Sequence, residues 1–166
     1  NRDTQNFKYI TMWQTSAYFS LVTGIGEVTS YREYDKDAGP LNAIGDIGKE
    51  GTCIGLASED DYIYAMIDEG PNIIIYKGRE VAGDYGLRRE WCPWIFVGTN
   101  VSSALAVIQH SSTDRRLWFG YGTGSNYSTA YVELYDDPTS NSSANFAASG
   151  WIRLPYTYGT NQYWDK

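Results

Sequence analysis

The feature that most constrains the fold is a strand–turn–strand pattern that recurs three times along the 166 residues. Similar segments start at Ala17, Asp61 and Arg116, so successive starts lie 44 and 55 residues apart. Each holds an apolar or aromatic run, a turn, and a second run that contains a tyrosine. The matching tyrosines are Tyr31, Tyr76 and Tyr131. Repetition at such a period indicates units that bury their faces against their neighbours.

The chain between these segments also favours strands over helices. Glycine and proline interrupt most windows before three helical turns could form. The run 102–109 fits a short capped helix, but we expect a buried strand because its neighbours on both sides favour strands. Turns are expected at Gly24–Gly26, at Gly70–Pro71 and in the turn-rich stretch 35–51. The expected strands are 7–14, 17–22, 27–34, 43–47, 52–58, 61–68, 72–77, 91–97, 103–110, 116–121, 129–135 and 150–156.

The fold class we expect is all-β, with about three four-stranded antiparallel β-propeller blades. Four strands in roughly 45–55 residues is the signature of one propeller blade. The first blade, which is partial, would occupy 1–50, the second 51–98, and the third, with the start of a continuation, 99–166. A β-sandwich of about 12 short strands is the alternative, and it explains the number of strands but not their recurring pattern.

Three blades do not close a ring, because propellers have about 4 to 8 blades. We therefore expect other protein chains, or the remainder of a longer polypeptide, to complete the assembly. An unpaired blade face or strand edge would be the surface of association. The start of the chain, Asn1-Arg2-Asp3-Thr4, has neither an initiator Met nor a signal-peptide pattern, as expected for a mature or excised segment.

Charge and composition exclude some classes of function. The chain has 13 Lys and Arg against 20 Asp and Glu, a net charge of −7, whereas a nucleic-acid binder needs a basic face. No run approaches 18 consecutive apolar residues, so no membrane-spanning helix is expected. Aromatic residues make up 16% of the chain, led by 15 Tyr, which is typical of β-rich proteins.

No residue set identifies a catalytic, metal or cofactor site. His110 is the single histidine of the chain and has no triad or metal-ligand pattern around it. The acidic residues 59–61 fit a solvated turn, and 35–39 lacks the later ligands of a calcium loop. Cys53 and Cys92 form no CxxC pair, and we expect two buried thiols, with a disulfide left open.

Other polar patterns carry little functional information. Arg115 and Arg116 follow Asp114, so local ion pairing is expected for them. The Asn-x-Ser sequences at Asn100, Asn126 and Asn141 mark surface loops and leave glycosylation open.

The last part of the chain concentrates aromatic residues that are candidates for ligand binding. Aromatic rings stack on sugars while neighbouring Asn and Asp bind hydroxyl groups. The same rings would equally serve to pack blade against blade, and packing is the expectation we favour. The candidates are Trp151, Tyr156, Tyr158, Tyr163 and Trp164.

Three short motifs resemble a known group of proteins. They are Pro93-Trp94 with Gly98, Arg116-Leu-Trp-Phe-Gly-Tyr-Gly122, and Phe146-Ala-Ala-Ser-Gly150. With them the chain resembles the β-propeller region of large phage tail and virion-associated proteins known mostly from environmental sequences. The resemblance implies a repeat scaffold in a virion or on an extracellular surface, with a role in host-surface attachment. It supplies no catalytic residues.

Three functions follow as hypotheses. The first is a structural and interaction module of a phage tail or other extracellular assembly, without enzyme activity. The second is a carbohydrate-binding module, which the aromatic, Asn and Asp content supports. The third, least favoured, is a propeller glycosidase or lyase with Asp61 and Asp68 near strand ends.

Overall fold

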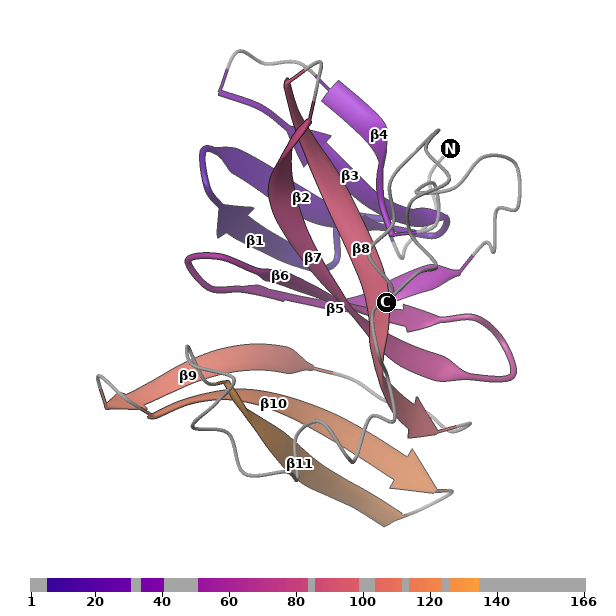
Figure 1. Ribbon diagram of the computed structural model, residues 1–166. Coiled ribbons are helices and arrows are strands. Elements are labelled where there is room, and N and C mark those ends of the chain that lie inside the picture. The colour runs from indigo at the N-terminus through magenta and orange to yellow at the C-terminus, as the bar shows by residue number, and fades with distance from the viewer. Residues whose placement is uncertain are drawn as a thin grey trace, which may run out of the picture.

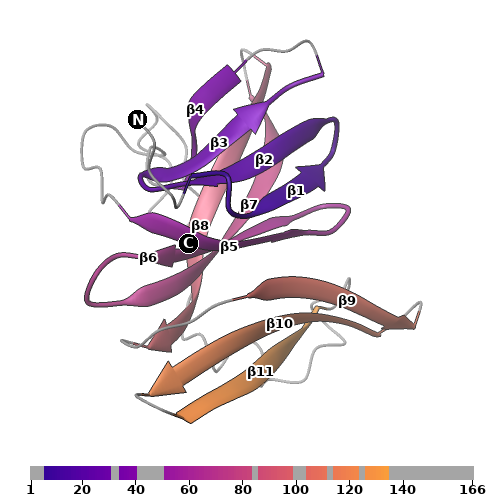
Figure 2. The same cartoon turned by 180° about the vertical axis from the view of Figure 1, so that it is seen from behind.

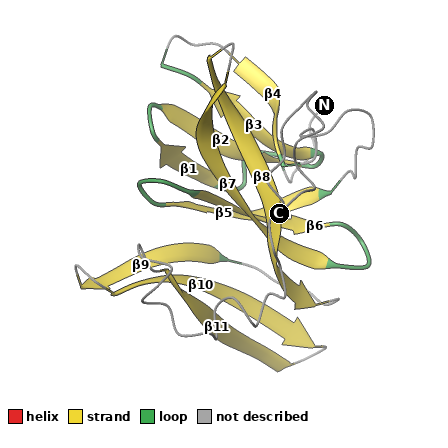
Figure 3. Ribbon diagram, viewed as in Figure 1, coloured by secondary structure: helices red, strands yellow, loops and turns green. Residues whose placement is uncertain are grey.

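The fold is all-β in the part of the chain that the computed structural model describes, namely residues 6–30, 34–40, 51–83, 86–98, 104–111, 114–123 and 126–134. These ranges form three antiparallel sheets and contain no helix (Figures 1 and 3). Consequently, none of these ranges offers a helix with the length and apolar character needed to cross a membrane. The expected strands at 43–47 and 150–156 lie outside the described residues.

The first sheet is a four-stranded meander in the order β1-β2-β3-β4. Its strands are β1 (Ile10–Trp13), β2 (Ser16–Leu21), β3 (Gly24–Val28) and β4 (Tyr34–Gly39).

Two expectations for the first sheet were wrong. Gly24–Gly26 begins β3 and is not a turn. The turn lies directly before it, at Val22 and Thr23. The glycine at position 26 serves close packing, because an added Cβ would lie 2.3 Å from the Phe19 ring. The expected strand 27–34 is divided, since β3 ends at Val28 and β4 starts at Tyr34. Strand β4 then continues to Gly39, within the stretch 35–51 that was predicted to be turns.

The second sheet is also a four-stranded meander, β5-β6-β7-β8. Its strands are β5 (Thr52–Ser58), β6 (Ile63–Asp68), β7 (Ile73–Gly83) and β8 (Gly86–Gly98). The last two strands are longer than predicted because their polar ends still pair: Arg79 lies opposite Glu90, with an ion pair of 3.4 Å. This hairpin reaches the first sheet, where the Trp91 indole donates to the Ala38 carbonyl at 3.0 Å.

The third sheet has three strands in the described residues, in the order β11-β10-β9. They are β9 (Leu105–Ser111), β10 (Asp114–Thr123) and β11 (Asn126–Leu134). The predicted strand near 103–110 is present, but the expectation that it is buried was wrong. Only Leu105 of β9 is buried, because one face of this strand is covered and the other is open.

The three sheets stack in chain order, with the second sheet between the other two (Figure 2). The first strands of the sheets are neighbours, since β5 contacts both β1 and β9. One apolar core lies between the first and second sheets and a second core between the second and third. The recurring segments at 17, 61 and 116 correspond to β2, β6 and β10, the second strand of each sheet.

Matching places in the recurring segments did not give the tyrosines matching surroundings. Tyr76 is buried in the core between the first and second sheets, whereas Tyr131 is half exposed on the third. Tyr31 lies outside the described residues. The strand pattern therefore repeats more faithfully than the tyrosine that accompanies it.

Candidate functional site

The face of the first sheet that meets the second carries a buried aromatic and ionic contact. The Trp13 and Tyr18 rings lie 5.7 Å apart, and the Tyr18 hydroxyl donates to Glu27 at 3.1 Å. Arg89 of β8 crosses from the second sheet, pairs with Glu27, and lies over the Tyr18 ring. Burial raises the pKa of Tyr18 above its usual range, although the Arg89 charge opposes this shift.

A contact of the same kind joins the second sheet to the third. Tyr64 and Trp94 lie with ring centroids 5.5 Å apart, and the Tyr64 hydroxyl donates to Glu59. Arg115 of β10 reaches Glu59 from the third sheet at 3.6 Å. Burial raises the pKa of Tyr64, so this phenol keeps its proton well above the pH at which an exposed tyrosine ionises.

Lys77 lies beside this second contact, inside a group of aromatic rings. Its ammonium is 3.6 Å from the Tyr62 ring centroid, 5.1 Å from that of Trp94 and 5.9 Å from that of Tyr64. Desolvation lowers the pKa of Lys77, against the opposing charge of Glu59. Cation–π attraction thus offsets part of the hydration energy that the ammonium loses on burial.

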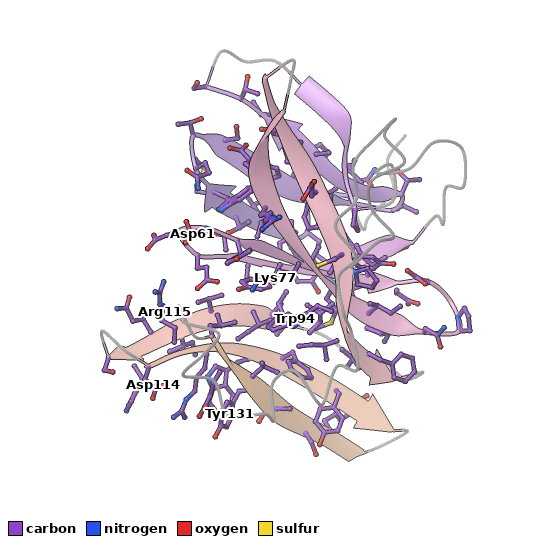
Figure 4. The ribbon with its side chains drawn as sticks, viewed as in Figure 1. Asp61, Lys77, Trp94, Asp114, Arg115 and Tyr131 are labelled. Carbon is purple, nitrogen blue, oxygen red and sulfur yellow. The ribbon has the colours of Figure 1, made fainter. Side chains whose placement is uncertain are left out.

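A small pocket opens next to Lys77. Its volume is about 160 Å³, room for only a few water molecules at about 30 Å³ each. It is lined by Tyr62, Lys77, Gly78, Arg79, Glu90 and Cys92. In Figure 4, Lys77 and Trp94 lie between the second and third sheets, with Arg115 close by on the third. Its charged lining consists of two cations, Lys77 and Arg79, and one carboxylate, Glu90.

The outer face of the third sheet carries a further Trp–Tyr pair. The Trp118 and Tyr131 rings lie 4.8 Å apart, and the Arg116 guanidinium is 4.6 Å from the Tyr131 centroid. Arg116 donates two hydrogen bonds of 2.9 Å to the Asp114 carboxylate. Glu133 lies directly opposite Arg116 in the β10–β11 register. This face is exposed, with Tyr131 at 45% and Tyr127 at 71% of their full accessibility.

The acidic residues suggested for acid–base catalysis are not brought together. Asp61 precedes β6 and Asp68 ends it, so the strand separates them by roughly 20 Å at about 3.3 Å per residue. Paired carboxylates in glycosidases lie about 5 to 10 Å apart. Asp68 instead accepts the Gly70 N–H at 2.9 Å and so shapes the following turn.

The expectations for the other residues singled out from the sequence agree with the structure only in part. Arg116 pairs locally with Asp114, as predicted, but Arg115 pairs across the sheet interface with Glu59, which is therefore not a solvated turn residue. His110 is exposed on β9. The ligand-binding candidates Trp151, Tyr156, Tyr158, Tyr163 and Trp164 lie outside the described residues.

Both cysteines are free thiols on opposite faces of the second sheet. Cys53 is buried in the core shared with the first sheet, and burial raises its pKa to about 12. Cys92 lies opposite Lys77 and is half buried, not buried as expected. Within the described residues, no three His, Cys, Asp or Glu side chains gather in a way that would hold a metal ion.

Sequence reasoning missed the Lys77 group and the Trp118–Tyr131 pair. A signal for the second was present, because a hairpin turn between Gly122 and Tyr127 places Trp118 opposite Tyr131. No comparable signal existed for Lys77, whose ring partners come from two separate segments, residues 62–64 and β8. Comparisons with protein-family models, curated proteins and solved structures found no match to the chain.

Proposed function

We propose that this chain is a structural and interaction module, a β-propeller segment whose three sheets are successive blades. The meander order within each sheet supports this proposal, as does the stacking of the sheets in chain order. The first strands lie next to one another, as the inner strands of neighbouring blades do. A β-sandwich would pack two sheets rather than three successive ones.

The observation that carries the proposal is the exposure of large apolar and aromatic side chains at both ends of the stack. The outer face of the first sheet exposes Ile10 and Met12, each at 64%, and Phe7 beside them. The outer face of the third sheet exposes Ile108 at 50%, together with Tyr127 and Tyr131. Contiguous apolar patches on a soluble protein mark surfaces of interaction. A module that joins further sheets at both ends accounts for this arrangement.

The proposed setting is a phage tail or another extracellular assembly with a role in surface attachment. The support is the resemblance of segments 93–98 and 116–122, which correspond to parts of β8 and β10. In both segments a tryptophan, Trp94 or Trp118, forms a ring pair with a tyrosine. These motifs are therefore suited to holding sheets together, which is what a scaffold requires.

Analytical ultracentrifugation of the chain tests the proposal. We expect a weight-average mass that rises with concentration above the 18.7 kDa of one chain. A chain that sediments as a compact monomer at every soluble concentration would contradict the proposal and favour a self-contained sandwich.

A carbohydrate-binding function is the second candidate, and the exposed Tyr127 and Tyr131 are the observation that favours it. Exposed aromatic rings offer stacking platforms to sugar rings. A glycan array separates the two functions. Reproducible binding that is lost in Tyr127→Ala, in a chain that stays monomeric, would replace the interaction module by a carbohydrate-binding one.

A further inference from the structure

Each of the three sheets carries one Trp–Tyr pair, and all three pairs lie on the same side of their sheets. We call the side that faces the next sheet along the chain the forward face, and the other side the backward face. The pairs are Trp13–Tyr18, Tyr64–Trp94 and Trp118–Tyr131. The first two are packed beneath the following sheet. The third has the same chemistry, but in the described part of the chain its Tyr131 is exposed.

The backward faces share a different chemistry, which is mainly aliphatic over the first two strands. The second sheet packs on the first through one set of mainly aliphatic side chains, and the third sheet packs on the second through another. The two sets are Leu56, Ile63, Ala65 and Ile67, and Leu105, Val107, Leu117 and Phe119. On the backward face of the first sheet, Ile10 and Met12 are exposed and Ala17 is half buried, whereas Leu21 and Phe19, which stacks with Phe7, are already buried within the chain. Each sheet thus carries a Trp–Tyr pair on its forward face and, over its first two strands, mainly aliphatic side chains on its backward face.

The charges fit the same arrangement. Arg89 and Arg115 come from a covering sheet to reach Glu27 and Glu59. On the third sheet the cation is already present, because Arg116 of the same sheet lies over Tyr131 and opposite Glu133. A sheet that covers this face therefore need not supply a cation. The backward face of the first sheet matches this over β1 to β3, whose residues on that side are all uncharged.

We propose that the forward face of the third sheet binds the backward face of the first sheet in a second copy of this chain. This inference rests on the proposed function as an interaction module and specifies its partner and geometry. The contact is head-to-tail, so each copy uses two different surfaces. Two copies contribute six sheets, which falls within the about 4 to 8 blades of closed propellers.

A pair of matched variants tests this geometry. Ile10→Glu places a charge on the backward face of the first sheet, and Ile108→Glu places one on the forward face of the third. Both isoleucines lie on the first strand of their sheet and are at least half exposed. Ile108 lies opposite Arg116, so the new carboxylate has a neighbouring cation. Thr23→Glu, in the exposed β2–β3 turn, is the control.

Each face variant alone should weaken self-association on the order of a hundredfold, because a carboxylate would lose its water in an apolar contact. The neighbouring Arg116 should make the effect of Ile108→Glu the smaller of the two. The control should associate like the unmodified chain. Mixing Ile10→Glu with Ile108→Glu should restore a two-chain species, because one native forward face then meets one native backward face. Sedimentation velocity measures all four samples, and circular dichroism checks that each variant keeps its strand content.

Other outcomes would overturn the inference. If Ile108→Glu abolishes association while Ile10→Glu leaves it intact, two forward faces meet, and only the interaction module survives. Failure of the mixture to associate, with both variants folded, rejects the head-to-tail contact in the same way. An unmodified chain that stays monomeric rejects the inference and the interaction module together. Should either variant lose its strand content, Met12→Gln and Tyr127→Ser replace them on the same faces.

Discussion

The second and third sheets differ in how many of their faces are covered. The second sheet packs against the first through Ile63, Ala65 and Ile67, and against the third through Tyr64, Met66 and Ile75. The third sheet packs through Leu117 and Phe119, while its other face exposes Ile108 and Tyr131. Similar Trp–Tyr pairs are therefore part of a core in one sheet and of a surface in the other. What covers a strand decides whether its side chains stabilise the fold or remain available for a partner.

The largest difference in stability between covered and open faces should come from removing apolar volume. Ile67→Ala, Ile75→Ala and Leu117→Ala each empty a fully buried site, and each should lower the free energy of unfolding by about 2–5 kcal/mol. Ile108→Ala, on the exposed face, should change it by less than about 1 kcal/mol in dilute solution. Urea denaturation of the four variants measures the difference. Equal losses for Leu117→Ala and Ile108→Ala would show that both faces of the third sheet are covered.

Replacing one of the adjacent arginines, Arg115 or Arg116, should give a smaller difference in stability between the two faces of the third sheet. Arg115 neutralises Glu59 at the interface, where both side chains are largely buried, so Arg115→Met should cost about 1–3 kcal/mol of stability. Arg116 pairs with Asp114 at the surface of its own sheet, so Arg116→Met should have a much smaller effect. Thermal unfolding compares the two. A larger loss for Arg116→Met would reverse the assignment of covered and open faces.

The dependence of stability on alkaline pH is the finest test. The folded chain raises the pKa of Cys53 from 9.0 to about 12. Between these values the unfolded chain releases a proton that the folded chain keeps, so stability falls as the pH rises through this range. One such group contributes at most about 1.4 kcal/mol per pH unit. Tyr18, Tyr64 and Tyr76, whose pKa values are also raised by burial, add to the fall at higher pH.

Urea titrations repeated at several pH values measure this slope. Cys53→Ala should be less stable than the unmodified chain at neutral pH but should lose stability less steeply above pH 9. An unchanged slope in Cys53→Ala would mean that the thiol is accessible to solvent in the folded chain.

Much of the strand pattern could be predicted from the sequence because it depends on local alternation. Strand β5 has the predicted bounds, and the faces of β11 alternate, with Leu134 buried and Tyr131 exposed. The errors fall where distant contacts decide. Gly26 belongs to a strand because Phe19 fills the space beside it, and the long β7–β8 hairpin extends to the first sheet through Trp91.

The candidate site was less predictable than the strands. Lys77 and its rings depend on bringing together β6, β7, β8 and the turn before β6, which no single stretch of sequence encodes. The Arg115–Glu59 contact likewise joins two sheets, so a search for local ion pairs finds only Arg116 and Asp114. Pairing within a hairpin is visible in sequence order, whereas pairing between stacked sheets is not.

The alternation of aromatic forward faces and aliphatic backward faces also has an evolutionary consequence. Neighbouring sheets supply one another's principal contacts, so a gene can gain a unit by internal duplication without redesigning what is already there. Under the proposed blade arrangement, a duplicated unit would bring one face of each kind. A chain lengthened in this way would keep the same chemistry at each boundary between units.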